Sequence, residues 1–322
     1  MERPIILRIK DIYYPVLVAI GTPVNLLTIV TLCRGNCHLS ISISIHMVAM
    51  AVVDLLATLV YRIAHQILRE RFSYSFLSCT VIFKLMLYMT CTNVGLSMSF
   101  TVCFTFDRFV AICCEKLKTR YCTERTAFIV IIIVSVLMCL ENIPFWFAFE
   151  HKKVINNIQW GFSPNVAFFR SPVGGAYFRL QSVLVSLVPF AFILLCNCLT
   201  VRRIVVTNTA RKTLRTPRTG NQRDPELENR RKSIILLLAM SANFILLSLT
   251  SVVSQWTDAL VLRIQPEYAD AAFIANESGY MLTQLKSCIN TCIYAASQRK
   301  FREELINVVK SQWKFILSLV KI

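Results

Sequence analysis

The sequence predicts an all-α membrane protein, a seven-transmembrane helix bundle with a short amphipathic C-terminal helix. Of its 322 residues, 55% are hydrophobic and only 16% are charged, and the mean hydropathy is +0.56. A soluble domain carries about a quarter charged residues, so this surplus of apolar side chains requires lipid as a second solvent. Several runs also reach the length of about 20 apolar residues that a bilayer-spanning helix needs.

Seven such runs lie near residues 12–33, 41–66, 76–107, 126–149, 178–204, 233–262 and 272–296. The runs are apolar on nearly all sides, which is typical of helices in lipid and not of one-sided helices in a soluble bundle. We therefore expect residues 1–298 to form one seven-helix domain. The tail, residues 299–322, has apolar residues on one face and should lie on the membrane surface. That apolar face consists of Phe301, Leu305, Val308, Val309 and Ile316.

The distribution of charge predicts the topology. The net charge is +17, and most of the 35 Lys and Arg residues fall on one side of the membrane if the N-terminus lies outside. Arg62 is among the minority on the outer side. The positive-inside rule then favours a multi-pass membrane protein with an outer N-terminus. Attraction to anionic lipid of the bilayer explains the basic face without any nucleic acid partner.

The reactive side chains do not predict an enzyme or a metal site. Most of the 13 cysteines fall inside the apolar runs, where cysteine behaves as a small apolar residue. The four histidines are scattered, and no nucleophile or zinc motif is present. We expect no catalytic activity, no disulfide, no metal and no cofactor.

Four of the seven runs carry polar or charged side chains at depths where lipid makes them costly. These residues are Asn25, Asp54, Asn93, Ser97, Lys286, Ser287 and Asn290. Asp54 is the strongest functional candidate, because a carboxylate near the middle of a span must be paired or solvated. The alternative is a protonated Asp54 that only links helices by hydrogen bonds. Taken together, the residues predict a polar network inside the bundle.

Asp107 and Arg108 follow a long apolar stretch whose only charge is Lys84. An acid–base pair at a helix end is stable while partly desolvated and weak once water enters. Such a pair can therefore bias a bundle that has two arrangements. The alternative is a solvated pair that caps the third helix.

These motifs resemble the rhodopsin-like (class A) G-protein-coupled receptors. The residues that carry the resemblance are Gly21-Thr-Pro-Val-Asn25, Ala51-Val-Val-Asp54, Asp107-Arg108-Phe109, Pro189 and Asn290-Thr-Cys-Ile-Tyr294. The segments Phe106–Cys114 and Asn290–Tyr294 are most similar to the orphan G-protein coupled receptor 139-like group.

The resemblance implies a switch, a partner and an ion site. Asp107 would hold Arg108 at rest, and activation would release Arg108, with Asn290 and Tyr294 in the same switch, to a heterotrimeric G protein on the cytoplasmic side. Receptors of this class commonly hold sodium against the residue that matches Asp54, with help from positions that match Asn93, Ser97 and Ser287. Lys286 departs from that pattern, and we expect it to form a direct ion pair with Asp54 in place of sodium.

Other departures concern signalling and the outer loop. Thr291 replaces the usual proline of the seventh run, and the sixth run lacks the family's Trp-x-Pro pair. Phe83 stands where the family carries a cysteine, and the loop 150–178 has no cysteine to pair with it. A receptor that binds without signalling therefore remains an alternative. An ion- or proton-coupled transporter is another, although the repeats it predicts are not visible.

The candidate ligand pocket lies on the outer side and comprises Thr90, Cys91, Phe145, Trp160 and Gln284. Thr90 replaces the amine-binding Asp of aminergic receptors and Gln284 replaces the retinal-binding Lys of opsins, so the ligand is expected to be another small molecule or peptide. Aromatic side chains would suit an aromatic amino acid or a short peptide. They could instead form an interfacial belt. Asn276-Glu-Ser278 is a glycosylation sequon, which we expect in the last outer loop.

Overall fold

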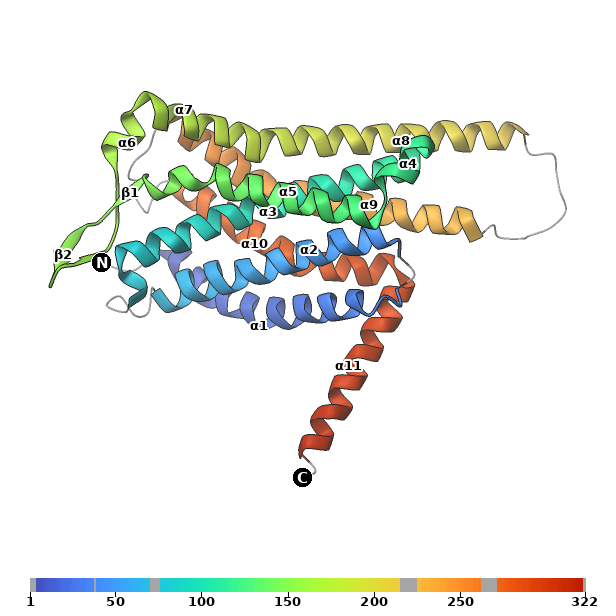
Figure 1. The fold of residues 1–322 in the computed structure, drawn as a ribbon, viewed down its shortest axis with the longest axis horizontal. Coiled ribbons are helices and arrows are strands. Elements are labelled where there is room, and N and C mark those ends of the chain that lie inside the picture. The colour runs from blue at the N-terminus through green and yellow to red at the C-terminus, as the bar shows by residue number, and fades with distance from the viewer. Residues whose placement is uncertain (1–3, 38, 70–75, 215–224, 262–270, 321–322) are drawn as a thin grey trace.

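The computed structural model describes residues 4–320 with gaps at 38, 70–75, 215–224 and 262–270. Within these residues, long helices pack lengthwise into a single bundle (Figure 1). The long helical segments are α1 (Ile5–Cys33), α2 (Ile41–Ala57) with η1 (Thr58–Arg69), α3 (Thr80–Cys113), α5 (Glu124–Glu141), α7 (Pro172–Gln181) with η4 (Ser182–Leu187) and α8 (Val188–Leu214), α9 (Pro225–Val261), α10 (Ala271–Ser297) and α11 (Arg299–Val320). The predicted helix bundle is confirmed.

Short elements connect these helices. They are η2 (Phe76–Ser78), α4 (Glu115–Tyr121), η3 (Ile143–Trp146), β1 (Phe149–Glu150), β2 (Lys153–Ile155), β3 (Ile158–Trp160), β4 (Ser163–Pro164) and α6 (Val166–Arg170). Strands β2 and β3 form an antiparallel hairpin, and β1 pairs with β4. Asn156 and Asn157 form the hairpin turn with positive φ angles of 50° and 59°, as a tight type I′ turn requires. We call the bundle end with this loop the hairpin end and the opposite end, where α11 begins, the α11 end (Figure 1).

Six of the described helical segments are long and apolar enough to cross a membrane. Helix α10 is not among the six, because polar residues such as Lys286 and Asn290 lower its hydropathy. Those side chains are buried in the bundle, where α10 packs against α9 and α1. By contrast, α5 buries only Ala127 and exposes Ile132, Val136 and Leu140. Such an apolar surface suits lipid contact.

Two details of the helices differ from the prediction. Helix α3 continues to Cys113, so Asp107 and Arg108 lie inside the helix and not at its end. The predicted apolar face of α11 is divided: Phe301 and Val308 are fully buried, whereas Val309 is exposed. The first part of α11 packs on α1 and α10, and the rest of the helix projects from the bundle (Figure 1). The side chain of Ile316 lies outside the described residues.

The larger of two buried apolar clusters lies toward the α11 end. Phe104, Leu236, Tyr294 and Phe301 belong to one buried cluster there, contributed by α3, α9, α10 and α11. A second buried cluster, with Phe190 and Phe244, joins α8 and α9. These clusters hold fixed the helices that carry the polar residues described below.

Helices α9 and α10 approach closely at Gly279, where an added Cβ would lie 2.7 Å from both the Cα and the N of Ser251. We expect Gly279→Ala to lower the melting temperature of the purified protein, because overpacking against backbone costs about 1–3 kcal/mol. Gly175→Ala is the matched control, since its Cβ would meet only ordinary contacts at 3.7 and 3.8 Å. Equal melting temperatures for the two variants would contradict this packing.

Candidate functional site

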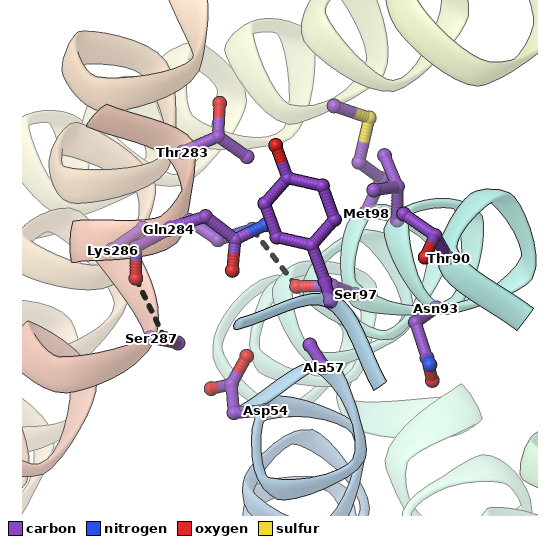
Figure 2. Close-up of a pocket in the computed structure, with 12 residues that line it drawn as sticks. Asp54, Ala57, Thr90, Asn93, Ser97, Met98, Thr283, Gln284, Lys286 and Ser287 are labelled. Carbon is purple, nitrogen blue, oxygen red and sulfur yellow. Dashed lines mark hydrogen bonds between the residues drawn. The ribbon is translucent and has the colours of Figure 1, made fainter. Parts of the chain in front are cut away.

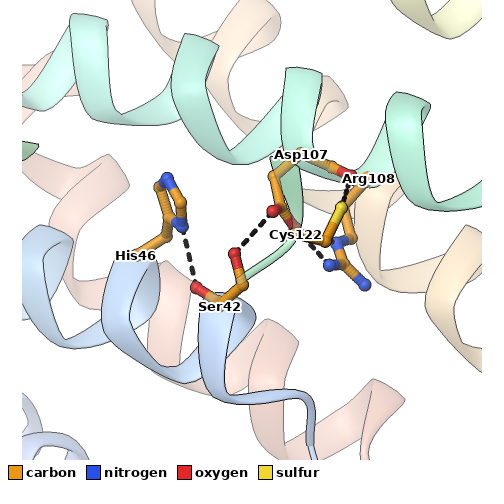
Figure 3. Close-up of polar contacts among 5 residues, drawn as sticks. All are labelled: Ser42, His46, Asp107, Arg108 and Cys122. Carbon is orange, nitrogen blue, oxygen red and sulfur yellow. Dashed lines mark hydrogen bonds and ion pairs between the residues drawn. The ribbon is translucent and has the colours of Figure 1, made fainter. Parts of the chain in front are cut away.

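Asp107 and Arg108 form a buried ion pair at the α11 end (Figure 3). Arg108 Nε donates to Asp107 Oδ2 at 3.0 Å, and Nη2 donates to the same oxygen. The other carboxylate oxygen, Oδ1, accepts a hydrogen bond of 2.6 Å from Ser42 Oγ of α2. Only 5% of the Arg108 side chain and 1% of the Asp107 side chain are exposed. The arginine is therefore held by its neighbour, and the carboxylate is also held by α2.

Two residues that sequence reasoning missed lie against this pair. His46 Nδ1 lies 2.8 Å from the Ser42 carbonyl oxygen, so this nitrogen carries the proton and donates. Cys122 Sγ donates to the Asp107 carbonyl oxygen at 3.6 Å. Burial and the nearby Asp107 carboxylate raise the pKa of Cys122 to about 11, so at neutral pH it remains a thiol that can donate. The connection after α4 is thus tied to α3 beside the ion pair.

A chain of side-chain amides joins Asp54 to α10 and α9. Asn290 Nδ2 donates to Asp54 Oδ2 at 3.1 Å. The Asn290 Oδ1 atom accepts from Asn243 Nδ2 of α9 at 3.0 Å. Asn243 was not predicted, although an asparagine inside the sixth apolar run was a usable signal. The side-chain amide of Asn290 therefore connects α10 with both α2 and α9.

The expected direct ion pair between Lys286 and Asp54 is wrong. The described ion pairs do not include it, and Lys286 Nζ instead donates to Ser97 Oγ of α3 at 2.9 Å (Figure 2). The ammonium also lies 5.0 Å from the centre of the Phe244 ring. Ser97 of α3 thus offers Lys286 a hydrogen bond, and Phe244 of α9 offers it a cation–π contact. The Oδ2 atom of Asp54, by contrast, already accepts a hydrogen bond from Asn290. Asp54 still attracts Lys286 electrostatically from a distance beyond direct contact.

Arg62 of η1 is a second buried cation in this region, and it is fully buried. Its guanidinium donates to the Gln284 side-chain oxygen at 3.1 Å, to Thr58 Oγ1 at 2.5 Å and to the Gln284 carbonyl oxygen at 2.6 Å. It also donates to Ser287 Oγ. The sequence analysis placed Arg62 on the outer side. Its position about two helical turns after Asp54, on the same face of the helix, was the signal that it points inward.

The remaining network candidates are buried but less connected. Asn25 Nδ2 donates to the Gly21 carbonyl oxygen of its own helix at 2.9 Å. Asn93 Nδ2 and the Tyr294 hydroxyl have no hydrogen-bond partner in the described part of the chain. The Tyr294 ring instead packs edge-on against Phe301, with 5.9 Å between ring centres. Thr291, which replaces the family's proline, hydrogen-bonds Thr28 of α1 at 2.7 Å.

A small pocket lies between α2, α3 and α10 (Figure 2). Its walls combine the ligand candidates Thr90 and Gln284 with five of the polar-network candidates. The full lining is Asp54, Ala57, Tyr61, Thr90, Asn93, Val94, Ser97, Met98, Thr283, Gln284, Lys286 and Ser287. The other ligand candidates, Cys91, Phe145 and Trp160, do not line this pocket. Phe145 packs edge-on against Tyr177 and Phe178.

An aromatic stack holds the loop between α5 and α7 against the first turn of α3, at the hairpin end. Phe83, which stands where the family carries a cysteine, stacks on Phe162 with 3.6 Å between ring centres and 6° between planes. Phe149 meets both rings edge-on. The backbone adds a bridge between Cys79 and Trp160 and a hydrogen bond of 2.7 Å from Thr80 Oγ1 to the Gly161 carbonyl oxygen. The Cys79 thiol is unpaired.

The expectation that Asn276 lies in a loop is wrong. It lies inside α10, which begins at Ala271. The next residue, Glu277, forms an ion pair of 2.7 Å with Lys10 of α1, which docks this turn of the helix on its neighbour. The Asn276 Oδ1 atom is buried and has no partner in the described part. The structure therefore gives no support to glycosylation at this position.

The comparison with protein families agrees with this architecture. The family described as "7 transmembrane receptor (rhodopsin family)" matches residues 24–294, a range that includes every residue of the polar network. The chain therefore belongs to the rhodopsin family of seven-transmembrane receptors and is a multi-pass membrane protein. No individual curated protein sequence matches the chain.

The aromatic stack predicts a loop that is stable without a disulfide. We expect the melting temperature of the purified receptor to be unchanged by reductant. Phe162→Ala should lower it by several degrees, because loss of a packed phenylalanine costs up to about 3–5 kcal/mol. Phe147→Ala, at a site 58% exposed, is the control. A melting temperature that falls on reduction would reveal a disulfide and overturn this view.

The two buried cations predict a receptor that does not bind sodium at Asp54. Ser97 and Ser287, which match two of the family's sodium-binding positions, already accept from Lys286 and Arg62. Exchange of sodium for an inert organic cation at constant ionic strength should leave the wild-type melting temperature unchanged. Lys286→Met should create sodium stabilisation, and the control Lys84→Met, whose ammonium lies over Trp146, should not. Sodium stabilisation of the wild type would refute the prediction.

Proposed function

We propose that this protein is a G-protein-coupled receptor of the plasma membrane that transmits an extracellular ligand signal to a heterotrimeric G protein. The observation that carries the proposal is the closed Asp107–Arg108 pair, buried at the α11 end beneath Ser42. The hairpin end faces outward in this proposal, and the α11 end faces the cytoplasm, in agreement with the positive-inside rule.

The proposed resting state depends on burial of the ion pair. Removal of one partner from a buried pair costs about 3–5 kcal/mol, whereas a solvated pair is worth only about 0–1 kcal/mol. Water that enters between the helices at the α11 end would therefore weaken the pair and free Arg108. The free guanidinium, with five donors, suits carbonyl oxygens and carboxylates at the end of a partner helix.

The proposed path from ligand to partner runs through the polar network. The pocket shares Asp54 and Lys286 with that network, and Asn290 continues from Asp54 to Asn243 on α9. A ligand that binds one arrangement of these helices more tightly than the other shifts the balance between them. The usual proline and tryptophan hinge of the sixth helix is absent, so Asn243 is our candidate for the contact that breaks when α9 moves.

The finer identity remains part of the proposal. The segments Phe106–Cys114 and Asn290–Tyr294 support a place beside the G-protein coupled receptor 139-like group. Tyr61, the aromatic residue of the pocket lining, supports an aromatic amino acid or a short peptide as the ligand. No observation favours the transporter alternative.

The coupling test is a nucleotide-exchange assay against a panel of G proteins, with surface expression measured in parallel. Arg108→Ala should abolish exchange at near-normal expression, because the arginine is the proposed contact with the G protein. Asp107→Asn should raise ligand-independent exchange, because a neutral amide holds the guanidinium less strongly. Arg120→Ala, on the exposed face of α4, is the control. Wild-type exchange by Arg108→Ala at normal expression would rule out the assigned role.

A further inference from the structure

We infer that the pocket between α2, α3 and α10 holds one ordered water molecule, which bridges the Lys286 nitrogen and the Asp54 carboxylate in place of a sodium ion. This inference goes beyond the proposed function, because it concerns what occupies the interior of the bundle. It holds whether or not the protein activates a G protein.

The first observation is the size and polarity of the pocket. Its free volume is about 20 Å³, and one water molecule needs about 10–15 Å³ of such space. A cavity that holds water is polar, whereas apolar cavities stay dry. The wall of this pocket includes the polar side chains of Asp54, Asn93, Ser97, Thr283 and Lys286. The pocket therefore has the room and the lining that a single buried water requires.

The second observation is that Lys286 and Asp54 line the same pocket but are held by different neighbours (Figure 2). Lys286 Nζ donates to Ser97 Oγ at 2.9 Å, and Asp54 Oδ2 accepts from Asn290 Nδ2 at 3.1 Å. The two groups nevertheless lie within each other's electrostatic field. A water molecule between them would connect two groups that their neighbours keep from direct contact.

Both groups retain the bonding capacity that a bridging water would use. A carboxylate offers about four acceptor sites, and Asn290 uses one site on Asp54. A lysine ammonium has three donors, and Ser97 accepts from one of them. A neutral lysine amine would still have a further N–H and would gain a lone pair that can accept from water. The bridge therefore does not depend on the charge of Lys286.

The third observation is the mixture of donors and acceptors on the pocket wall, which distinguishes water from an ion. Asn93 Nδ2 and Thr283 Oγ1 are buried pocket-lining groups without a hydrogen-bond partner in the described part of the chain. Sodium could contact Asp54, but it cannot accept from the Asn93 amide. Chloride could accept from that amide, but it would be repelled by the Asp54 carboxylate. Water both donates and accepts, and of these three species it alone complements the whole wall.

The bridge would connect three helices at one point. Through the water, Asp54 of α2 would be linked to Lys286 of α10, which is already bonded to Ser97 of α3. A bridging water is nearly as favourable in enthalpy as a direct hydrogen bond. The water would therefore take the role that the sequence assigned to a direct ion pair between Asp54 and Lys286.

The test is a pair of high-resolution structures of the purified full-length protein, one in sodium buffer and one in which an inert organic cation replaces sodium at the same ionic strength. We expect a solvent peak in both maps within about 3.2 Å of Lys286 Nζ and of an Asp54 carboxylate oxygen. A peak that is present only in sodium would identify the ion and overturn the inference. The absence of a bridging peak from both maps would also overturn it. The measurement needs no G protein, so its failure is distinct from a failure of coupling.

A variant with a larger side chain assigns the peak to the pocket. Ala57 lines the pocket, so the added methyl groups of Ala57→Val should fill the space of the water and remove the bridging peak. Ala49→Val makes the same change on the same helix outside the pocket lining and should retain the peak. A bridging peak that persists in Ala57→Val would overturn the inference. The two wild-type structures test it independently of whether this variant folds.

Discussion

The burial of two cations inside a lipid-embedded bundle is the constraint on which the interior arrangement depends. Lys286 and Arg62 lie where an unpaired charge would be very costly, and each is surrounded by oxygens or an aromatic ring from neighbouring helices. Ser97, Gln284 and Ser287 are thereby committed to fixed positions. Asp54 remains close enough to offset part of the charge, yet its carboxylate is held by Asn290. These contacts fix how α2, α3 and α10 are positioned along one another.

The α11 end and the middle of the bundle accommodate buried charge in different ways. At the α11 end, Asp107 and Arg108 are neighbours in sequence and neutralise one another directly. In the middle of the bundle, charge is spread over helices that come from distant parts of the chain. Asn290 links Asp54 of the pocket wall to Asn243 of α9, so movement of α9 relative to α10 would disturb this contact. In our proposal, this amide contact carries the signal, whereas the apolar cluster around Phe104 and Tyr294 keeps the helices packed.

The bundle was predictable because its apolar content leaves lipid as the only compatible solvent, and the contact of Asp107 with Arg108 followed from their adjacency. The partner of Lys286 was not predictable, because the long lysine side chain can reach several helices. Only the packing of the bundle decides which helix supplies the partner. Arg62 was missed because it lies near the end of its apolar run, where a lysine or arginine usually reaches the headgroups. The stack of Phe83 on Phe162 depends on the path of a loop, which no periodicity records. Local features were thus readable from sequence, and contacts between distant segments were not.

In our proposal the pocket and the ion pair at the α11 end share one conformational equilibrium, and a double-mutant cycle can detect this coupling. Ligand-independent nucleotide exchange would be measured for the wild type, Lys286→Met, Ser42→Ala and the combined variant. Ser42 is chosen because it touches Asp107 and is far from the pocket lining. We expect a coupling energy of about 0.5–2 kcal/mol between the two substitutions. Effects that add to within about 0.5 kcal/mol, as for independent sites, would contradict it.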